Sequence, residues 1–261
     1  MGIVNVTPDS FSDGGEAFET SDAIARGRAM AAAGADILDI GGESTRPGSA
    51  PVSEDEERRR VVPVIQALAA DGLLVSIDSR RAGVIADALA AGARIVNDVT
   101  ALTGDPKSID VVATSDASVI LMHMRGQPAT MQDDPVYDDA PTEIHDYLAG
   151  RVAACEAAGI ARHRIAVDPG IGFGKNLDHN LQIINRWREL HEIGCAVVLG
   201  ASRKSFIGKL TGQTEAQARV PGSLATALAA RARGAQIFRV HDVAETRQAL
   251  TVFDAISNVG A

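Results

Sequence analysis

The stretch AMAAAGADILDIGGES, residues 29–44, contains the unit that decides the fold. An alanine-rich helical segment ends at Gly34, a short apolar segment of strand type follows, and the strand segment stops at polar residues. Glycine has no Cβ, so it can adopt the left-handed conformation that closes the last turn of a helix. The stretch is therefore predicted to form a helix that leads directly into a buried strand.

The same unit recurs along the chain. It appears in ALAADGLLVSIDSR (67–80), DALAAGARIVNDV (87–99), CEAAGIARHRIAVDPG (155–170), LHEIGCAVVLGAS (190–202) and ARARGAQIFRVHD (230–242). The glycines that end the helical parts are Gly72, Gly92, Gly159, Gly194 and Gly234. With an opening strand through Val6 and the segment SVILMH, which ends at His123, the chain has eight predicted strands, each followed by a segment able to form a helix.

Alternating strands and helices indicate a parallel sheet, because each strand must return through a crossover helix. The strands are nearly continuous apolar runs, as expected when both faces of a sheet are covered. Eight such units in 261 residues predict an α/β fold, a (β/α)8 TIM barrel, as a single domain over residues 1–261. A doubly wound open sheet is the alternative, but its glycine fingerprint would have to be GIGFGK, where Lys175 replaces the last glycine.

The composition limits the kinds of partner and compartment. The apolar content of 46% is ample for a packed core, and the formal net charge of −9 argues against a nucleic-acid or anionic-membrane partner. No apolar run approaches the roughly 20 residues that a membrane helix requires. Cys155 and Cys195 lack metal-binding spacing, and no basic leader opens the chain, so we expect buried thiols and a cytoplasmic protein.

Polar residues stand at the ends of the predicted strands. In a parallel barrel these ends share one face, where active sites form. A single acidic residue there is often only the cap of a turn, and this role suits Asp98. Acids, amides and cations together instead indicate one ligand with a flat heterocyclic end and an anionic end. The set comprises Asn5, Asp39, Asp78, Asn97, Asp98, His123, Asp168, Ser202, Arg203, Lys204, Arg239 and His241.

The same residues argue against two other chemistries. A zinc hydrolase barrel would carry an early HxH pair and further histidines at strand ends, whereas only His123 and His241 stand there. The chain has no GxSxG motif and no convincing Cys–His pair, which argues against covalent catalysis.

Eight short motifs, in order along the chain, carry a resemblance to a known family. They are MGIVNVTPDSFSDGG, DIGGESTRPG, SIDS, IVNDV, LMHMRGQP, DPGIGFGKN, GASRKSFIG and FRVHD. Together they resemble the dihydropteroate synthase family of folate biosynthesis, which has a pterin-binding TIM barrel. The resemblance implies that 6-hydroxymethyl-7,8-dihydropterin diphosphate condenses with 4-aminobenzoate, giving 7,8-dihydropteroate and diphosphate with the help of Mg2+.

The resemblance also implies roles for individual residues. The expected pterin contacts are Asp78, Asn97, Asp168, Lys204 and, as an apolar wall, Met122. The expected diphosphate contacts are Asn5, which is also the expected Mg2+ ligand, Arg239 and His241. The expected 4-aminobenzoate pocket comprises Thr45, Arg46, Pro47, Phe173, Ser202 and Arg203. The residues expected to act in catalysis are Asn5, Arg46, Asp78, Asp168, Lys204, Arg239 and His241.

Some of these assignments keep a plainer alternative. Phe173 could serve in ordinary packing, and Ser202 could cap the following helix. The loop NVTPDSFSDGG (5–15) resembles the family's first mobile loop and GGESTRPG (41–48) the second, which implies that both close over the site once diphosphate is bound and that Phe11 is a lid residue.

The resemblance further implies a homodimer formed through the outer helices of the later units. It also implies inhibition by sulfonamides that mimic 4-aminobenzoate. Two rival functions remain. One is a pterin-binding methyltransferase barrel that uses methyltetrahydrofolate, although such a barrel lacks the TPDSFSDGG loop and the SRKS strand end. The other is a non-catalytic pterin carrier, which the intact charged residues of the site disfavour.

Overall fold

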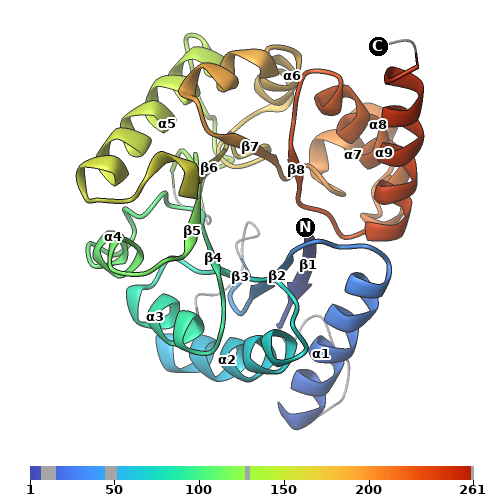
Figure 1. The fold of residues 1–261 in the computed structure, drawn as a ribbon. Helices are drawn as coiled ribbons and strands as arrows, with labels where there is room; N and C mark the ends of the chain where they lie inside the picture. Colours follow the sequence, from blue (N-terminus) through green and yellow to red (C-terminus); the bar gives the residue numbers. More distant parts are fainter. Residues whose placement is uncertain (7–15, 45–51, 127–129, 260–261) are drawn as a thin grey trace.

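The structure, a computed structural model, describes residues 1–6, 16–44, 52–126 and 130–259, with the backbone alone for residues 16–19. Within these ranges the chain forms eight short strands, which Figure 1 shows arranged in a ring. They are β1 (Gly2–Asn5), β2 (Leu38–Gly41), β3 (Val75–Asp78), β4 (Ile95–Asp98), β5 (Ser118–Met122), β6 (Ile165–Asp168), β7 (Ala196–Leu199) and β8 (Ile237–Phe238).

The strands are parallel and pair in chain order from β1 to β8. The ring closes where the chain after β8 meets β1. A parallel bridge joins Gly2 to Val240, the amide of Ile3 donates to the carbonyl of Val240 at 3.0 Å, and the amide of Val240 donates to the carbonyl of Met1 at 2.9 Å. The predicted (β/α)8 barrel is therefore confirmed, and the open doubly wound sheet is wrong.

Helices surround the ring of strands on the outside (Figure 1). The α-helices are α1 (Glu16–Ala32), α2 (Glu54–Ala70), α3 (Ala82–Ala90), α4 (Ser108–Ala113), α5 (Ala140–Ala157), α6 (Leu177–Asn185), α7 (Ser205–Thr211), α8 (Val220–Arg231) and α9 (Val243–Ser257). The 3-10 helices are η2 (Arg162–Arg164), η3 (Trp187–Ile193) and η4 (Gln217–Arg219).

The glycines predicted to end the helical segments have the expected backbone conformation. All six have positive φ angles, between +77° and +113°: Gly34, Gly72, Gly92, Gly159, Gly194 and Gly234. The units differ from the prediction in detail, because β1 ends at Asn5 rather than Val6 and the segment between β7 and β8 contains both α7 and α8. Cys155 and Cys195 are buried and free, as expected.

Two apolar layers hold the barrel together. The larger one lies between the strands and the helices and contains the side chains of alternate strand residues such as Ile40, Ile77 and Val167. The smaller one fills the interior of the barrel with Met1, Ile37, Ile95, Ile120, Ala166, Ala196, Val198 and Ile237. Successive side chains of a strand point to opposite faces, so each strand supplies both layers.

The interior layer determines where the polar residues of the strands lie. Residues two positions beyond an interior residue point to the same face. Five polar or apolar residues stand two positions after an interior residue: Asp39, Asn97, Met122, Asp168 and Arg239 follow Ile37, Ile95, Ile120, Ala166 and Ile237, respectively. These side chains therefore enter the barrel above the apolar interior, at the carboxyl end of the strands, where barrel active sites form.

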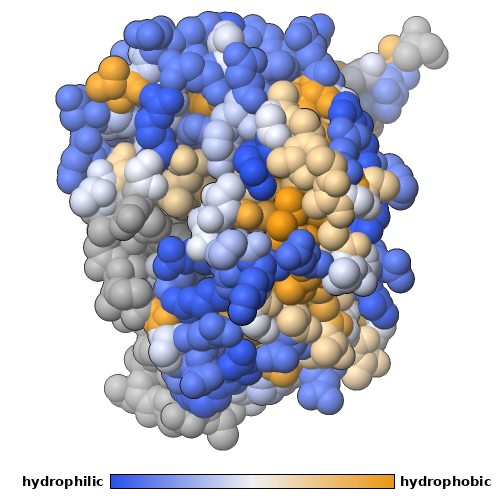
Figure 2. Space-filling view, turned by 90° about the vertical axis from the view of Figure 1, so that its left-hand side faces the viewer, coloured by the Kyte–Doolittle hydropathy of each residue, from blue (hydrophilic) through white to orange (hydrophobic). Residues whose placement is uncertain are grey.

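The face shown in Figure 2 is mostly hydrophilic, with hydrophobic side chains gathered near its middle. Among the described residues, no helix has the length and apolar character needed to cross a membrane.

Candidate functional site

The mouth of the barrel brings together four of the five predicted pterin contacts through strand register. Asp78 of β3 is the Cα partner of Asn97 of β4, and Met122 of β5 is the partner of Asp168 of β6. The fifth, Lys204, comes from the loop after β7, where a Cβ added at Gly200 would lie 3.3 Å from Oδ2 of Asp168 and 4.0 Å from Nζ of Lys204. Two acids, an amide, a cation and an apolar side chain thus share one face of the barrel.

Arg239 is held between two acids inside this mouth. Its Nε donates to Oδ2 of Asp39 at 2.6 Å, and its Nη2 donates to Oδ2 of Asp78 at 2.7 Å. The amide of Asn97 donates to the same oxygen of Asp39 at 3.1 Å. Asp39 is fully buried, and its Oδ1 has no hydrogen-bond partner among the described residues. Asp39 therefore orients both Arg239 and Asn97, a role that the sequence assignments missed.

Burial shifts the pKa values of the groups at the mouth. Burial raises the pKa of Asp78 to about 7, although the Arg239 guanidinium opposes the shift. Burial also raises the pKa of Asp168, against the opposing effect of Lys204 and of the Gly170 amide, which donates to Asp168 Oδ1 at 2.7 Å. Burial lowers the pKa of Lys204 to about 8, and Asp168 opposes this shift. The site therefore holds groups that titrate near neutral pH, as functional sites often do.

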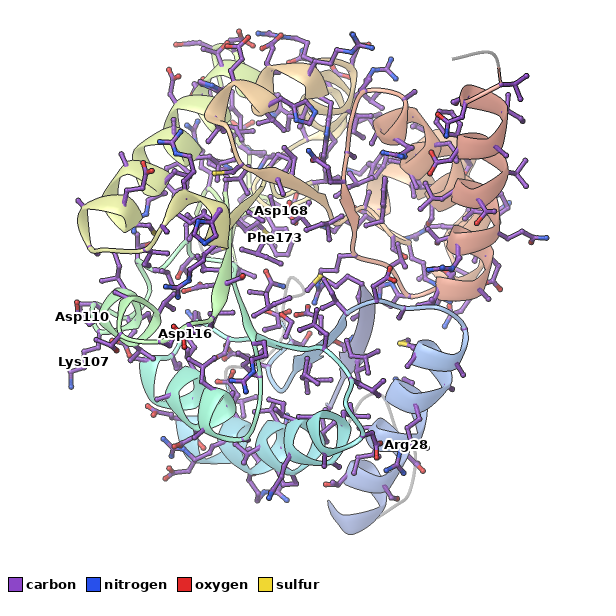
Figure 3. All side chains as sticks on the ribbon, in the orientation of Figure 1. Arg28, Lys107, Asp110, Asp116, Asp168 and Phe173 are labelled. Atoms are coloured by element: carbon purple, nitrogen blue, oxygen red, sulfur yellow. The ribbon has the colours of Figure 1, made fainter. Side chains whose placement is uncertain are left out.

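Phe173 lies at the mouth rather than in the core. It belongs to neither apolar layer, and Figure 3 places it beside Asp168 near the centre of the ring, whereas Lys107 and Asp110 lie on the outside. The Nζ atom of Lys204 lies 4.5 Å from the centroid of the Phe173 ring, within the range of a cation–π interaction. The alternative that Phe173 is ordinary packing is therefore disfavoured.

Ser202 and His241 contact each other where β7 and β8 end. The Oγ atom of Ser202 accepts from the His241 amide at 3.1 Å and lies 3.0 Å from His241 Nδ1. The alternative that Ser202 caps the next helix is wrong, because α7 begins at Ser205 with Lys204 in the cap position. Arg203 has a positive φ of 59° and donates from Nε to Asp242 Oδ2 at 2.9 Å.

Other predicted residues are less constrained by the described contacts. Asn5 ends β1, half-buried, opposite Gly41 of β2. Thr45, Arg46 and Pro47 lie outside the described residues, as does Phe11, so their roles stay predictions.

Asp98 caps a turn, the role that its position in the sequence suggested. It points out of the barrel, fully buried, and its Oδ1 accepts from the amide and the hydroxyl of Thr100, each at 2.7 Å. Its Oδ2 accepts from the amide of Leu102 at 3.1 Å. Asp98 therefore caps the turn after β4 and takes no part in the mouth.

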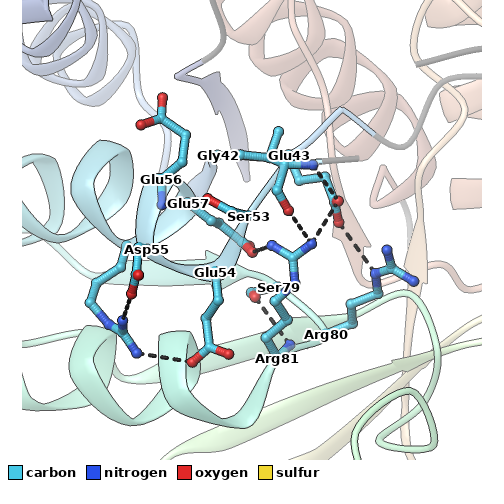
Figure 4. Close-up of polar contacts among 12 residues, drawn as sticks. Gly42, Glu43, Ser53, Glu54, Asp55, Glu56, Glu57, Ser79, Arg80 and Arg81 are labelled. Carbon is cyan, nitrogen blue, oxygen red and sulfur yellow. Dashed lines mark hydrogen bonds and ion pairs between the residues drawn. The ribbon is translucent and has the colours of Figure 1, made fainter. Parts of the chain in front are cut away.

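A cluster of charged residues that the sequence assignments missed joins the turn after β3 to both sides of residues 45–51 (Figure 4). Arg81 donates to Oε1 of Glu43 at 3.0 Å, to the carbonyl of Val52 and to the buried carboxylate of Glu57. The same Glu43 oxygen accepts from the amide of Val52 at 3.2 Å. The paired arginines directly after SIDS were the available sequence signal for this cluster.

Comparison with known proteins identifies similar sequences and structures over nearly the whole chain. The family model described as pterin binding enzyme matches residues 1–241. The chain is 50% identical over 260 residues to the dihydropteroate synthase of Neisseria meningitidis serogroup C, covering 98% of this chain and 92% of that protein.

Two solved structures give the same result. The dihydropteroate synthase of Xanthomonas albilineans with 4-aminobenzoic acid is 49% identical with a TM-score of 0.93, covering 99% of this chain and 92% of that one. The Yersinia pestis dihydropteroate synthase with a sulfonamide drug is 47% identical with a TM-score of 0.93, covering 98% and 93%.

Proposed function

The chain belongs to the pterin-binding enzyme family and is a dihydropteroate synthase, and we propose that its barrel mouth binds the two substrates of this reaction with the residues described above. The reaction is a transferase reaction of folate biosynthesis that joins a dihydropterin diphosphate to 4-aminobenzoate. The main support for the residue assignment is the register of the strands, in which Asp78 lies beside Asn97 and Met122 beside Asp168.

The pterin would occupy the acidic part of the mouth. Its ring presents neighbouring N–H donors, and an ionised carboxylate offers two acceptor oxygens to such a pair. Asp78, Asn97 and Asp168 would bind these edges, Lys204 would donate to a ring acceptor, and Met122 would cover the ring face. Arg239, which Asp39 and Asp78 hold in place, would lie between the pterin and its diphosphate.

The chemistry requires charge stabilisation rather than a strong base. The amino nitrogen of 4-aminobenzoate forms a bond to the pterin methylene carbon, the bond from that carbon to the diphosphate oxygen breaks, and the new ammonium releases its proton to solvent. Positive charge that develops on the pterin would be favoured by ionised Asp78 and Asp168, and the leaving diphosphate by Arg239 and His241. Ser202, which contacts His241, would help to orient the imidazole.

A magnesium ion is part of the proposal. Among the described residues no cluster of three or more His, Cys, Asp or Glu could hold a metal. The amide oxygen of Asn5 at the end of β1 nevertheless suits Mg2+, which binds through few protein ligands and keeps water and phosphate oxygens. When bound, the ion would neutralise charge on the diphosphate.

Diphosphate release that depends on 4-aminobenzoate tests the proposed function. We expect release only when pterin diphosphate, 4-aminobenzoate and Mg2+ are all present, and loss of release with EDTA that excess Mg2+ restores. A sulfonamide should compete with 4-aminobenzoate. Methyl transfer from methyltetrahydrofolate would favour the methyltransferase alternative, and pterin binding without any turnover would favour the carrier.

The pH dependence follows from two shifted pKa values. Asp78 becomes ionised as pH rises through about 7, and Lys204 loses its charge as pH rises through about 8. We therefore expect kcat/KM for pterin diphosphate to form a narrow bell between these values, since both charged forms bind the pterin. In Lys204→Arg the alkaline limb of the profile should move to higher pH, because arginine stays protonated. A profile that is flat from about pH 6 to 9 would contradict the assignment of both groups.

The assembly and the compartment are also proposals. The resemblance to the family supports a homodimer through the outer helices of the later units, which a molar mass of twice the chain in light scattering would verify. The two buried free cysteines are compatible with the reducing cytoplasm, and a fluorescent fusion would locate the protein.

A further inference from the structure

A buried lysine outside the assigned site connects two loops at the mouth of the barrel. Lys175 is only 2% exposed. Its Nζ atom lies 2.9 Å from Nδ1 of His123, 2.9 Å from the carbonyl oxygen of Phe173 and 3.4 Å from the carbonyl oxygen of His123. Three hydrogen-bonding atoms therefore surround the amine of Lys175, although burial lowers its pKa well below the usual value. Because an unsatisfied buried lysine would be costly, this complete set of partners points to a specific role.

The histidine partner is suited to accept a hydrogen bond. Burial, together with the nearby charges of Lys175 and Arg125, lowers the pKa of His123 to about 2, so its ring is neutral. A neutral imidazole has one acceptor nitrogen, and the tautomer that carries its proton on Nε2 would place this acceptor at Nδ1, which faces Lys175. The ring itself is fixed by an edge contact with Tyr147, at 4.9 Å between centroids. Lys175 therefore binds to a fixed part of the loop after β5.

The loop that contains Lys175, residues 170–175 after β6, is held at every carbonyl group. The six carbonyls accept from the Phe173 amide and from the side chains of Lys204, Gln132, Lys175, Tyr137 and Asn180. Gly170, Gly172 and Gly174 all have positive φ angles, and a Cβ at Gly170 would overlap the carbonyl oxygen of His123. The backbone of this loop thus lies directly against the end of β5.

Among these donors, Lys175 is the one that holds Phe173, a residue of the proposed 4-aminobenzoate pocket. It binds the carbonyl of Phe173, whose ring lies under Lys204 at the mouth. We propose that Lys175 is a positioning residue for 4-aminobenzoate: by joining the Phe173 backbone to His123, it fixes the Phe173 ring on which the arylamine stacks. This inference rests on the proposed function, and it assigns a role to a residue that touches neither substrate.

Replacing Lys175 by methionine tests the proposal, since methionine fills a similar volume without donating hydrogen bonds. We expect the KM for 4-aminobenzoate to rise about tenfold or more, because the carbonyl of Phe173 loses its donor. The calorimetric affinity for the pterin, which depends on Asp78 and Asn97, should change by less than about twofold. A general loss of stability would instead weaken the binding of both substrates together.

Two further variants separate positioning from loosening of the loop. Tyr137→Phe removes the donor to the neighbouring carbonyl of Gly174, which is 2.9 Å from the hydroxyl, and should leave the KM for 4-aminobenzoate nearly unchanged. In a Phe173→Ala background, Lys175→Met should have little further effect on that KM, because the ring that it positions is gone. An equal rise in Tyr137→Phe, or a full additional effect in the Phe173→Ala background, would overturn the proposal.

The structure of the variant gives a readout that does not depend on activity. A crystal structure of Lys175→Met should show the Phe173 carbonyl turned away and the ring displaced from Lys204. An unmoved Phe173 would overturn the proposal even if the KM rises. If Lys175→Met does not fold, Lys175→Gln, which keeps two donors, should fold and show a smaller displacement. If the wild-type protein releases no diphosphate, the proposed function is wrong. The crystal structure of Lys175→Met would still show whether Lys175 holds Phe173 in place.

Discussion

Replacing Asp168 by asparagine should abolish most of the pterin affinity while leaving the fold intact. The carboxylate is buried at the mouth, and removing one partner of a buried charged hydrogen bond costs about 2–5 kcal/mol, or roughly 30-fold to several thousand-fold in affinity. An asparagine oxygen could still accept from the Gly170 amide. Titration calorimetry with the pterin, beside a thermal melt, measures both parts of this prediction.

The stability part of this prediction follows from the direction of the pKa shift. Burial raises the pKa of Asp168 above its unfolded value, so the ionised form destabilises the fold once pH exceeds the unfolded pKa of about 4. A neutral asparagine removes this cost at neutral pH. The Tm of Asp168→Asn should therefore equal or exceed that of the wild type.

Asp98 provides the matched control, because it is also a buried aspartate at the end of a strand, β4, but its side chain lies on the outer face of the sheet. Asp98→Asn should lower stability by about 1–3 kcal/mol, since one of its backbone partners loses an acceptor, and should leave the pterin affinity unchanged. Normal pterin affinity in Asp168→Asn would falsify the assignment of Asp168 to the pterin.

Gly170→Ala should strongly destabilise the fold. The residue has a φ of +70°, and a Cβ there would overlap the backbone carbonyl of His123, which cannot move without displacing β5. The left-handed conformation costs roughly 1–2 kcal/mol and the overpacking about 1–3 kcal/mol more, so we expect a loss of about 2–5 kcal/mol in urea denaturation.

Gly72 separates the two effects in Gly170→Ala. Its φ of +78° is similar, but a Cβ there would meet nothing within 4 Å. Gly72→Ala should therefore lower the free energy of unfolding only by the cost of the left-handed backbone conformation, about 1–2 kcal/mol. Equal losses in the two variants would show that the contact with His123 does not matter.

The fold was predictable because its signals are local and repeated. Six units carry a glycine that ends a helix before an apolar run that stops at a polar residue, and with the opening strand and SVILMH they make eight strands, which leaves few alternatives to a closed barrel. The polar ring was predictable for the same reason, since the carboxyl ends of parallel strands share a face. The assignment of Thr45, Arg46 and Pro47, by contrast, still depends on the resemblance alone.

The remaining features of the site depend on contacts between distant residues. Asp39 and Asp98 look alike in the sequence, and only the alternation relative to the interior layer separates the one that orients Arg239 from the one that caps a turn. Lys175 and His123 are 52 positions apart, so nothing local indicates that they meet. Such pairs arise from the packing of two loops, which propensity and periodicity do not determine.

The loop at residues 170–175, whose six carbonyls all accept hydrogen bonds, has a consequence for inhibitor design. A compound that stacks on Phe173 would meet a surface that is ordered before it arrives, so the conformational entropy lost on binding would be mainly that of the compound. Rigid inhibitors should therefore gain most at this wall of the pocket. A resistance mutation that acts by shifting the backbone of this loop would break several hydrogen bonds at once. Such mutations should therefore be rare.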